Sequence, residues 1–185
     1  MFVPWRPLQN AASEPTQHIM KHFIAFLFVA VTALPAAAQL RQVPELTLAA
    51  ANRLATGAVD ICGRQGRAIV VAVLDRSGNL VALQRADGVG PHNIEASRRK
   101  AYTAASTHKA TLDLARQAQA HPDARNLATL PELLLLGGGV PLTAGGQLVG
   151  AIGVAGGGGA ANDHACAEGA LRALPELDQL SHSQF

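Results

Sequence analysis

The sequence predicts an α+β domain whose antiparallel sheet has about five strands flanked by helices. Short apolar runs typical of strands follow one another, joined by turn residues. Segments with helical periodicity lie on both sides of these groups. Strand–helix–strand crossovers are too few for a doubly wound parallel fold, and no internal repeat is visible.

Five segments are predicted to be strands. The first, Ala68–Leu74, is a continuous apolar run rich in β-branched residues, as expected of a strand covered on both faces. Residues 75–79 (Asp-Arg-Ser-Gly-Asn) have the composition of a turn. The other predicted strands are Leu80–Gln84, Leu133–Leu136, and the hairpin of Val140–Thr143 with Gln147–Val154.

Helices are predicted from apolar residues at three- and four-residue steps. The first begins near Thr47, whose side chain can cap it, and the second follows Pro91. The last is expected to start with Asn162 or Asp163 as its cap and to stop before Pro175. The predicted ranges are Leu46–Gln65, His92–Lys109, Thr111–Ala120 and a final helix reaching Leu174.

Residues 20–38 are predicted to be a secretory signal peptide. Lys21 supplies a short basic region, Phe23–Leu34 is apolar apart from one Thr, and small residues precede Gln39. Residues 1–19 show no signal-like order and are interpreted as a non-native or misassigned extension. The mature chain is then a single domain, 39–185, periplasmic or secreted, with no integral membrane segment expected. In that compartment Cys62 and Cys166 could form a disulfide or remain two buried thiols.

Composition argues against several functions. Residues 39–185 hold 13 basic and 12 acidic side chains and no basic tract, so nucleic-acid binding has poor support. No pair of histidines has the spacing of a zinc protease site. Gly156–Ala161 fits G-x-G-x-x-A, but no strand follows to carry the acidic residue of a dinucleotide site.

The segment 137–159 holds eleven of the eighteen glycines. Glycine lets a backbone or a flat ligand approach closely, so this segment predicts a docking surface. Gly156 and Gly157, at the start of the last helix, are candidates to hold a carboxylate or phosphate. Asp163 is a candidate helix cap, with a direct ligand role as the alternative.

The helix after Pro91 carries the other candidates. His92 is either a functional imidazole, as an iron ligand, or a solvent-facing residue at the helix start. Arg98, Arg99 and Lys100 form either a solvated face or charges that meet an anion. Tyr102 and Thr103 have oxygens that could ligate iron, although packing roles are the alternative for each.

These pieces, in this order, resemble the GlcG/HbpS-like family of haem-binding proteins, also known as DUF336. Five stretches carry the resemblance and, with the first helix, span nearly all of residues 39–185. They are Val73–Leu83 (VLDRSGNLVAL), Asp87–Ala104 (DGVGPHNIEASRRKAYTA), Gly138–Leu142 (GGVPL), Gly145–Gly159 (GGQLVGAIGVAGGGG) and Asp163–Ala170 (DHACAEGA). Where the family often has Ser and Gln, this chain has Ala155 and Asn162.

The resemblance implies a three-layer, profilin- or PAS-like domain that assembles into homo-oligomers and binds haem for uptake, buffering or redox sensing. Iron ligation differs among members, with Thr and His both implicated. It therefore implies a region, His92 with Lys100, Tyr102 and Thr103, and not one ligand. The alternative is an enzyme or accessory protein acting on a small hydroxy- or oxo-acid. In that case the amides of 156–163 and a basic side chain would hold the carboxylate, and His92 would act as general acid or base.

Overall fold

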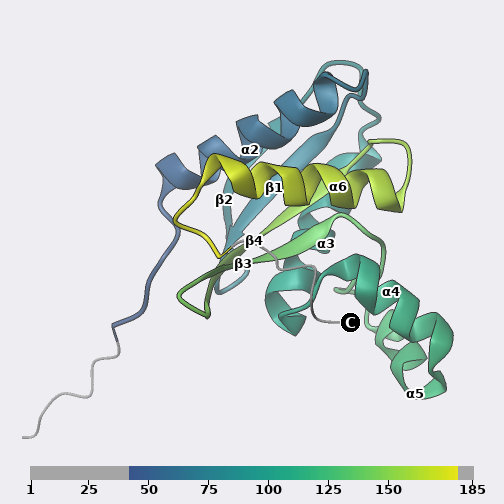
Figure 1. Cartoon of the computed structure of the whole chain (residues 1–185). Helices are drawn as coiled ribbons and strands as arrows, with labels where there is room; N and C mark the ends of the chain where they lie inside the picture. Colours follow the sequence, from purple (N-terminus) through teal and green to yellow (C-terminus); the bar gives the residue numbers. More distant parts are fainter. Residues whose placement is uncertain (1–41, 179–185) are drawn as a thin grey trace, which may run out of the picture. The chain divides into compact units, whose positions relative to one another are not determined.

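The computed structural model describes residues 42–178, which contain one antiparallel sheet (Figure 1). The predictions for residues 1–19 and 20–38 lie outside the described residues. The sheet has four strands in the order β2-β1-β4-β3, so the predicted α+β class is confirmed with one strand fewer. The strands are β1 (Val70–Asp75), β2 (Leu80–Arg85), β3 (Gly139–Ala144) and β4 (Gln147–Ala155).

Strand β1 is buried along nearly its whole length because it pairs on both sides and is covered on both faces. Val70 pairs with Arg85 of β2 and with Ala155 of β4, and both pairings are antiparallel. The continuous apolar run in the sequence therefore predicted the environment of this strand correctly. Strands β3 and β4 form the predicted hairpin around Gly145 and Gly146, both with positive φ.

Helices cover both faces of the sheet (Figure 1). Helices α2 (Leu48–Gly63) and α6 (Ala160–Ala170) pack together on one face, and most of the large core side chains lie beneath them. Helix α3 (His92–Thr107) packs on the other face. The remaining elements are α4 (Thr111–Ala120), α5 (Pro122–Arg125), η1 (Asn126–Thr129) and η2 (Leu171–Ala173).

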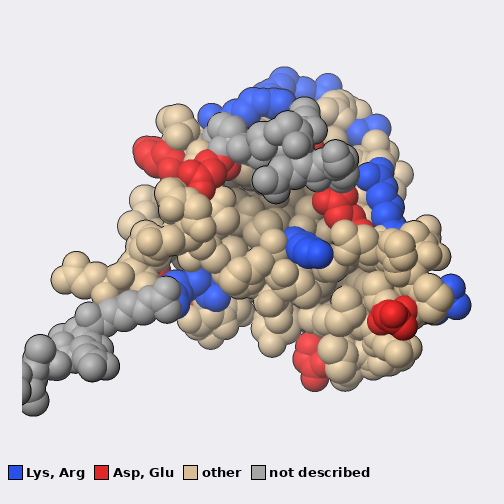
Figure 2. All heavy atoms as spheres, turned by 60° about the horizontal axis from the view of Figure 1, so that its bottom comes forward, with Lys and Arg blue, Asp and Glu red and all other residues tan. Residues whose placement is uncertain are grey.

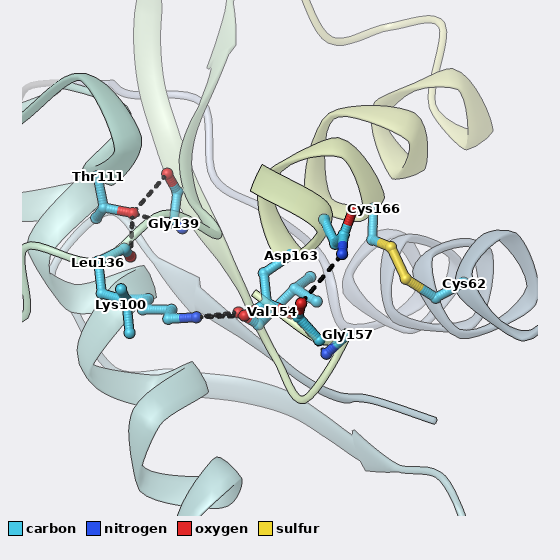
Figure 3. A network of polar contacts seen from close by, with 11 residues as sticks. Cys62, Lys100, Thr111, Leu136, Gly139, Val154, Gly157, Asp163 and Cys166 are labelled. Carbon is cyan, nitrogen blue, oxygen red and sulfur yellow. Dashed lines mark hydrogen bonds and ion pairs between the residues drawn. A yellow bond between two sulfur atoms is a disulfide. The ribbon is translucent and has the colours of Figure 1, made fainter. Parts of the chain in front are cut away.

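A disulfide between Cys62 and Cys166 joins α2 to α6 (Figure 3). Both residues are buried, and their Cα atoms lie 5.8 Å apart. Of the two possibilities that the sequence left open, the structure has the disulfide. The covalent link fixes the two helices that cover the larger core.

Helix α3 lies unusually close to the sheet because glycines of the strands leave room for its backbone. A Cβ on Gly153 would collide with the carbonyl oxygen of Ser97, and one on Gly139 with that of Lys100. The contact layer is correspondingly made of small side chains, chiefly Ala101, Ala104, Ala105 and Ala151 with Leu74. These glycines therefore serve helix packing.

The predicted strand Leu133–Leu136 is wrong, because side chains of α3 and α4 take the backbone groups that a strand would pair. Leu134 N–H donates to Thr103 Oγ1 at 2.8 Å. Thr111 Oγ1 donates to the carbonyl of Leu136 at 2.8 Å. The segment is thus held as an irregular loop against the helices.

Charged side chains do not gather into one surface on the face that Figure 2 shows; Lys/Arg and Asp/Glu are scattered among other residues. Recognition of an anion on such a face would depend on individual cations. Within residues 42–178, no helix combines the length and the apolar composition needed to cross a membrane.

Candidate functional site

Lys100 and Asp163, two of the predicted site residues, form a buried ion pair (Figure 3). Lys100 Nζ lies 2.7 Å from Asp163 Oδ2 and also donates to the carbonyl of Val154 at 2.9 Å. The two side chains are 1% and 7% exposed. Both charges therefore face each other in the interior, where they tie α3 to α6 and to the end of β4.

The second carboxylate oxygen of Asp163 binds the glycine-rich turn. Asp163 Oδ1 accepts a hydrogen bond from the Gly157 N–H at 2.7 Å. The expectation that Asp163 caps α6 is wrong, since α6 begins at Ala160 with Gly159 as its N-cap, and Asp163 lies in the first turn. The carboxylate that the Gly157 amide holds is thus the chain's own.

Thr103 is also interior. Its side chain is buried and donates to the Arg99 carbonyl at 2.7 Å while accepting from Leu134 N–H at 2.8 Å. These contacts hold the loop after η1 against α3.

The glycine-rich segment divides into two parts. Gly137, Gly138, Gly139 and Gly153 are packed against the protein's own atoms, which corrects the expectation of a docking surface there. The turn 156–158 instead lines an open hollow of about 550 Å³, the glycine hollow. Its lining residues are Gly66, Arg67, Ala68, Gly88, Val89, Gly90, Asn93, Gly156, Gly157, Gly158 and Asn162.

A second hollow of about 360 Å³, the α3 hollow, lies between α3, the β1–β2 turn and the loop after η1. Both volumes are within the range of small-molecule sites, roughly 300–1,000 Å³. Arg99 and Tyr102 are the predicted site residues that this hollow brings together. The full lining is Leu74, Gly78, Glu95, Arg98, Arg99, Tyr102, Pro131 and Glu132.

Tyr102 forms one wall of the α3 hollow. Its side chain is 38% exposed, and its ring lies over Gly78, where an added Cβ would come within 3.0 Å of the ring atoms. Gly78 has φ +86°, so the β1–β2 turn requires glycine here for conformation as well as for space. The Tyr102 ring therefore packs on the bare backbone of Gly78, while the residue remains partly open to solvent.

The turn that carries Gly78 is organised by Asp75. Asp75 Oδ1 accepts from the N–H groups of Ser77 and Asn79 at 2.8 and 2.9 Å. Burial alone would raise the pKa of Asp75, but these hydrogen bonds and one from the Asn79 side chain hold the pKa below its ordinary value. The carboxylate is thus the form that shapes the turn.

The two arginines of the α3 hollow differ in their partners. Arg98 Nη1 pairs with Glu95 Oε2 at 2.9 Å. Arg99 Nη2 donates to the carbonyls of Pro131 and Leu133, both at 2.8 Å. Arg99 Nε is buried and has no hydrogen-bond partner within residues 42–178.

His92 is exposed at the first position of α3 and lines neither hollow. It precedes Arg99 by two helical turns, about 10 Å along the axis, and so lies on the same side of the helix. The sequence interpretation did not select Glu95 and Glu132. Glu95 could have been found from its helical spacing to Tyr102, whereas Glu132 depends on the path of an irregular loop.

Comparison with known proteins supports the predicted family. A family model described as "Haem degrading protein HbpS-like" matches residues 46–172. The chain belongs to the HbpS-like family. The match runs from the start of α2 into η2 and includes both hollows, so the resemblance found in the sequence is confirmed.

The matches to individual relatives cover nearly the whole length of each relative. A double mutant of Streptomyces reticuli HbpS is 39% identical, with TM-score 0.69, covering 74% of this chain and 92% of that one. An uncharacterized 15.0 kDa protein of Citrobacter freundii is 32% identical over 139 residues, which are 74% of this chain and 97% of that protein. A PduOC–haem complex, at 23% identity, TM-score 0.66 and 75% and 100% coverage, shares the fold.

Proposed function

We propose that this protein binds haem reversibly in the α3 hollow, without turnover of its own. The observation that carries the proposal is the combination of apolar lining residues, a phenol and two guanidinium groups around one opening. Haem requires such a set, because its ring is apolar, its iron takes an axial donor and its propionates are anionic. The family description and the haem complex of a protein with this fold support it.

Each lining residue has a defined part. Pro131 and the Tyr102 ring, which covers Gly78, would face the porphyrin, and the positive charge for its propionates would come from arginine at the opening. Tyr102, which lines the hollow, is the candidate iron donor, and His92, which lies outside the lining, is the alternative donor predicted from the sequence. Bound haem would supply a redox-active iron centre.

A second candidate function is action on a small hydroxy- or oxo-acid, as an enzyme or accessory protein. The glycine hollow favours it, because Arg67 and Asn93 line an open space next to backbone that carries no side chains. The Gly157 amide is already bound to Asp163, so Arg67 would hold the substrate carboxylate in its place. His92 does not line this hollow, but its imidazole lies beside Gly90, which does, and it would be the general acid or base.

The proposed compartment is the periplasm or the exterior of the cell. The signal peptide predicted over 20–38 supports it, and a disulfide between Cys62 and Cys166 is compatible with an oxidising compartment. Cell fractionation with intact-mass measurement tests this proposal. The expected mature form begins at Gln39; an uncleaved cytosolic chain would contradict it.

Homo-oligomer formation is also proposed. Leu48, Leu80, Leu130 and Leu136 are each more than 40% exposed. Association would bury exposed apolar side chains of this kind. Size-exclusion chromatography with light scattering is expected to show a multiple of the chain mass, and a strict monomer would refute the proposal.

Haem titration of the purified full chain tests the main proposal. A saturable, persistent shift of the Soret band is expected. Tyr102→Phe and His92→Ala identify the iron donor through the spectrum of the bound form, with His121→Ala as an exposed control on the α4–α5 connection. Absence of a shift favours the second candidate, and steady loss of the Soret band with a reductant would indicate haem degradation in place of binding.

A further inference from the structure

The α3 hollow contains two adjacent arginines whose charges are compensated differently. Arg98 is neutralised by Glu95, one helical turn earlier. Within residues 42–178 Arg99 makes no ion pair: its hydrogen-bond partners are the carbonyls of Pro131 and Leu133, and no carboxylate lies within 4.0 Å of its nitrogens. A partly buried guanidinium without an anionic partner is unusual unless a ligand supplies one.

We propose that Arg99, and not Arg98, recognises a carboxylate of the porphyrin bound in the α3 hollow. This inference rests on the proposed function and specifies how its ligand is selected. The contribution of Arg99 would come from its Nη1, which makes no hydrogen bond among the described residues and, unlike Nε, is not buried. A carboxylate entering the hollow would complete the donor set with a charge-assisted hydrogen bond.

The geometry of Arg99 makes it suited to this part. Its Nη2 is anchored by the carbonyls of Pro131 and Leu133, so the guanidinium plane is fixed before a ligand arrives. A fixed donor loses less conformational freedom on binding than an exposed side chain does. The Arg98 side chain is 48% exposed and is not anchored by any backbone carbonyl of the described residues, and its charge is already compensated by Glu95.

Two carboxylates also line the hollow, and they define the expected charge dependence. Glu95 is paired with Arg98, whereas Glu132 has no ion pair with either arginine. Glu132 would repel an incoming carboxylate. Glu132→Gln is therefore expected to tighten binding of a dicarboxylate porphyrin and to leave that of its ester unchanged.

The test compares metal-free protoporphyrin IX with its dimethyl ester, which keeps the ring and removes both negative charges. Binding to the full chain is followed by porphyrin fluorescence, so iron ligation does not contribute. The free acid is expected to bind at least about tenfold more tightly, the size of effect that loss of a charge-assisted hydrogen bond produces. Arg99→Gln should abolish this preference, and Arg98→Gln should preserve it.

The outcomes separate the inference from the function on which it rests. Equal affinity for acid and ester, or loss of the preference only in Arg98→Gln, overturns the inference even where haem binds. Absence of saturable binding by haem and by both porphyrins overturns the proposed function and the inference with it. Because the comparison of acid with ester is made on the unmodified chain, a folding defect in a variant cannot decide it.

Discussion

Lys100 Nζ lies 2.7 Å from Asp163 Oδ2, although the two residues belong to helices on opposite faces of the sheet. The pair lies beside Gly138. A Cβ added at Gly138 would be 2.8 Å from Asp163 Cβ and 3.1 Å from Lys100 Nζ. A glycine between the strands and helices therefore makes room for a buried ionic link. Through the Gly157 amide this link also fixes one edge of the glycine hollow.

Lys100→Met is expected to destabilise the protein by about 3–5 kcal/mol, since it leaves the Asp163 carboxylate buried without a cation. Urea unfolding of the variant and of the parent measures the difference. Lys109→Met, at an exposed position, is the matched control and should change little. In the double variant Lys100→Met/Asp163→Leu the cost should be smaller than the sum of the single costs; strict additivity would show that the two side chains do not interact.

Removing the disulfide by Cys62→Ala/Cys166→Ala is expected to cost about 2–5 kcal/mol, because the bond closes a long loop of the unfolded chain. The two cysteines are 104 residues apart. Thermal unfolding with and without reductant should reproduce the effect in the parent chain. The disulfide would be contradicted if the parent chain, treated with reductant while unfolded, changed neither its intact mass nor its melting temperature.

Gly153→Ala should displace α3, because the new methyl group would occupy the position of the Ser97 carbonyl oxygen. Overpacking of this kind costs about 1–3 kcal/mol or more. Gly63→Ala, at the end of α2 with no atom within 4 Å of the added Cβ, is the control and should be neutral or stabilising. If both substitutions are tolerated equally, the close packing of α3 on β4 is wrong.

The β1–β2 turn should lose stability in acid. The pKa of Asp75 is lowered in the folded state, so its carboxylate stabilises the fold above the unfolded pKa of about 3.9. That contribution disappears as the pH falls through the lower folded pKa. Asp75→Asn is therefore expected to be destabilising at pH 7 and nearly neutral in acid, once the pH falls below the folded pKa of Asp75. Urea unfolding at both pH values measures this, and a pH-independent difference would count against the turn geometry.

The sheet could largely be predicted because its signals are local. Val70–Asp75 is apolar throughout, and Gly145 and Gly146 mark the hairpin turn within the two strands that it joins. The segment Leu133–Leu136 could not be assigned in this way. Its conformation depends on Thr103, 31 residues before Leu134, and on Thr111. The four consecutive leucines give no local signal of the hydrogen bonds to these distant residues.

The site was predictable only in outline. Arg99 and Tyr102 were selected from the sequence and meet in one hollow, but Lys100, Thr103 and Asp163 are buried and bonded to the protein itself. A charged residue on a helix shows in the sequence, whereas its orientation depends on which face packs against the sheet. Gly139 and Gly153 determine which side of α3 packs against the sheet. This role is seen only in the contacts that the two glycines make with α3.

Fluorine NMR of the full chain labelled with 3-fluorotyrosine tests the location of the ligand most directly, because Tyr102 is the only tyrosine. Saturation with ferric haem is expected to broaden the single resonance strongly, since the paramagnetic iron would lie in the α3 hollow. Zinc protoporphyrin, a diamagnetic control, should shift the resonance without that broadening. A resonance left unchanged by haem that the Soret band shows to be bound would contradict haem binding in the α3 hollow.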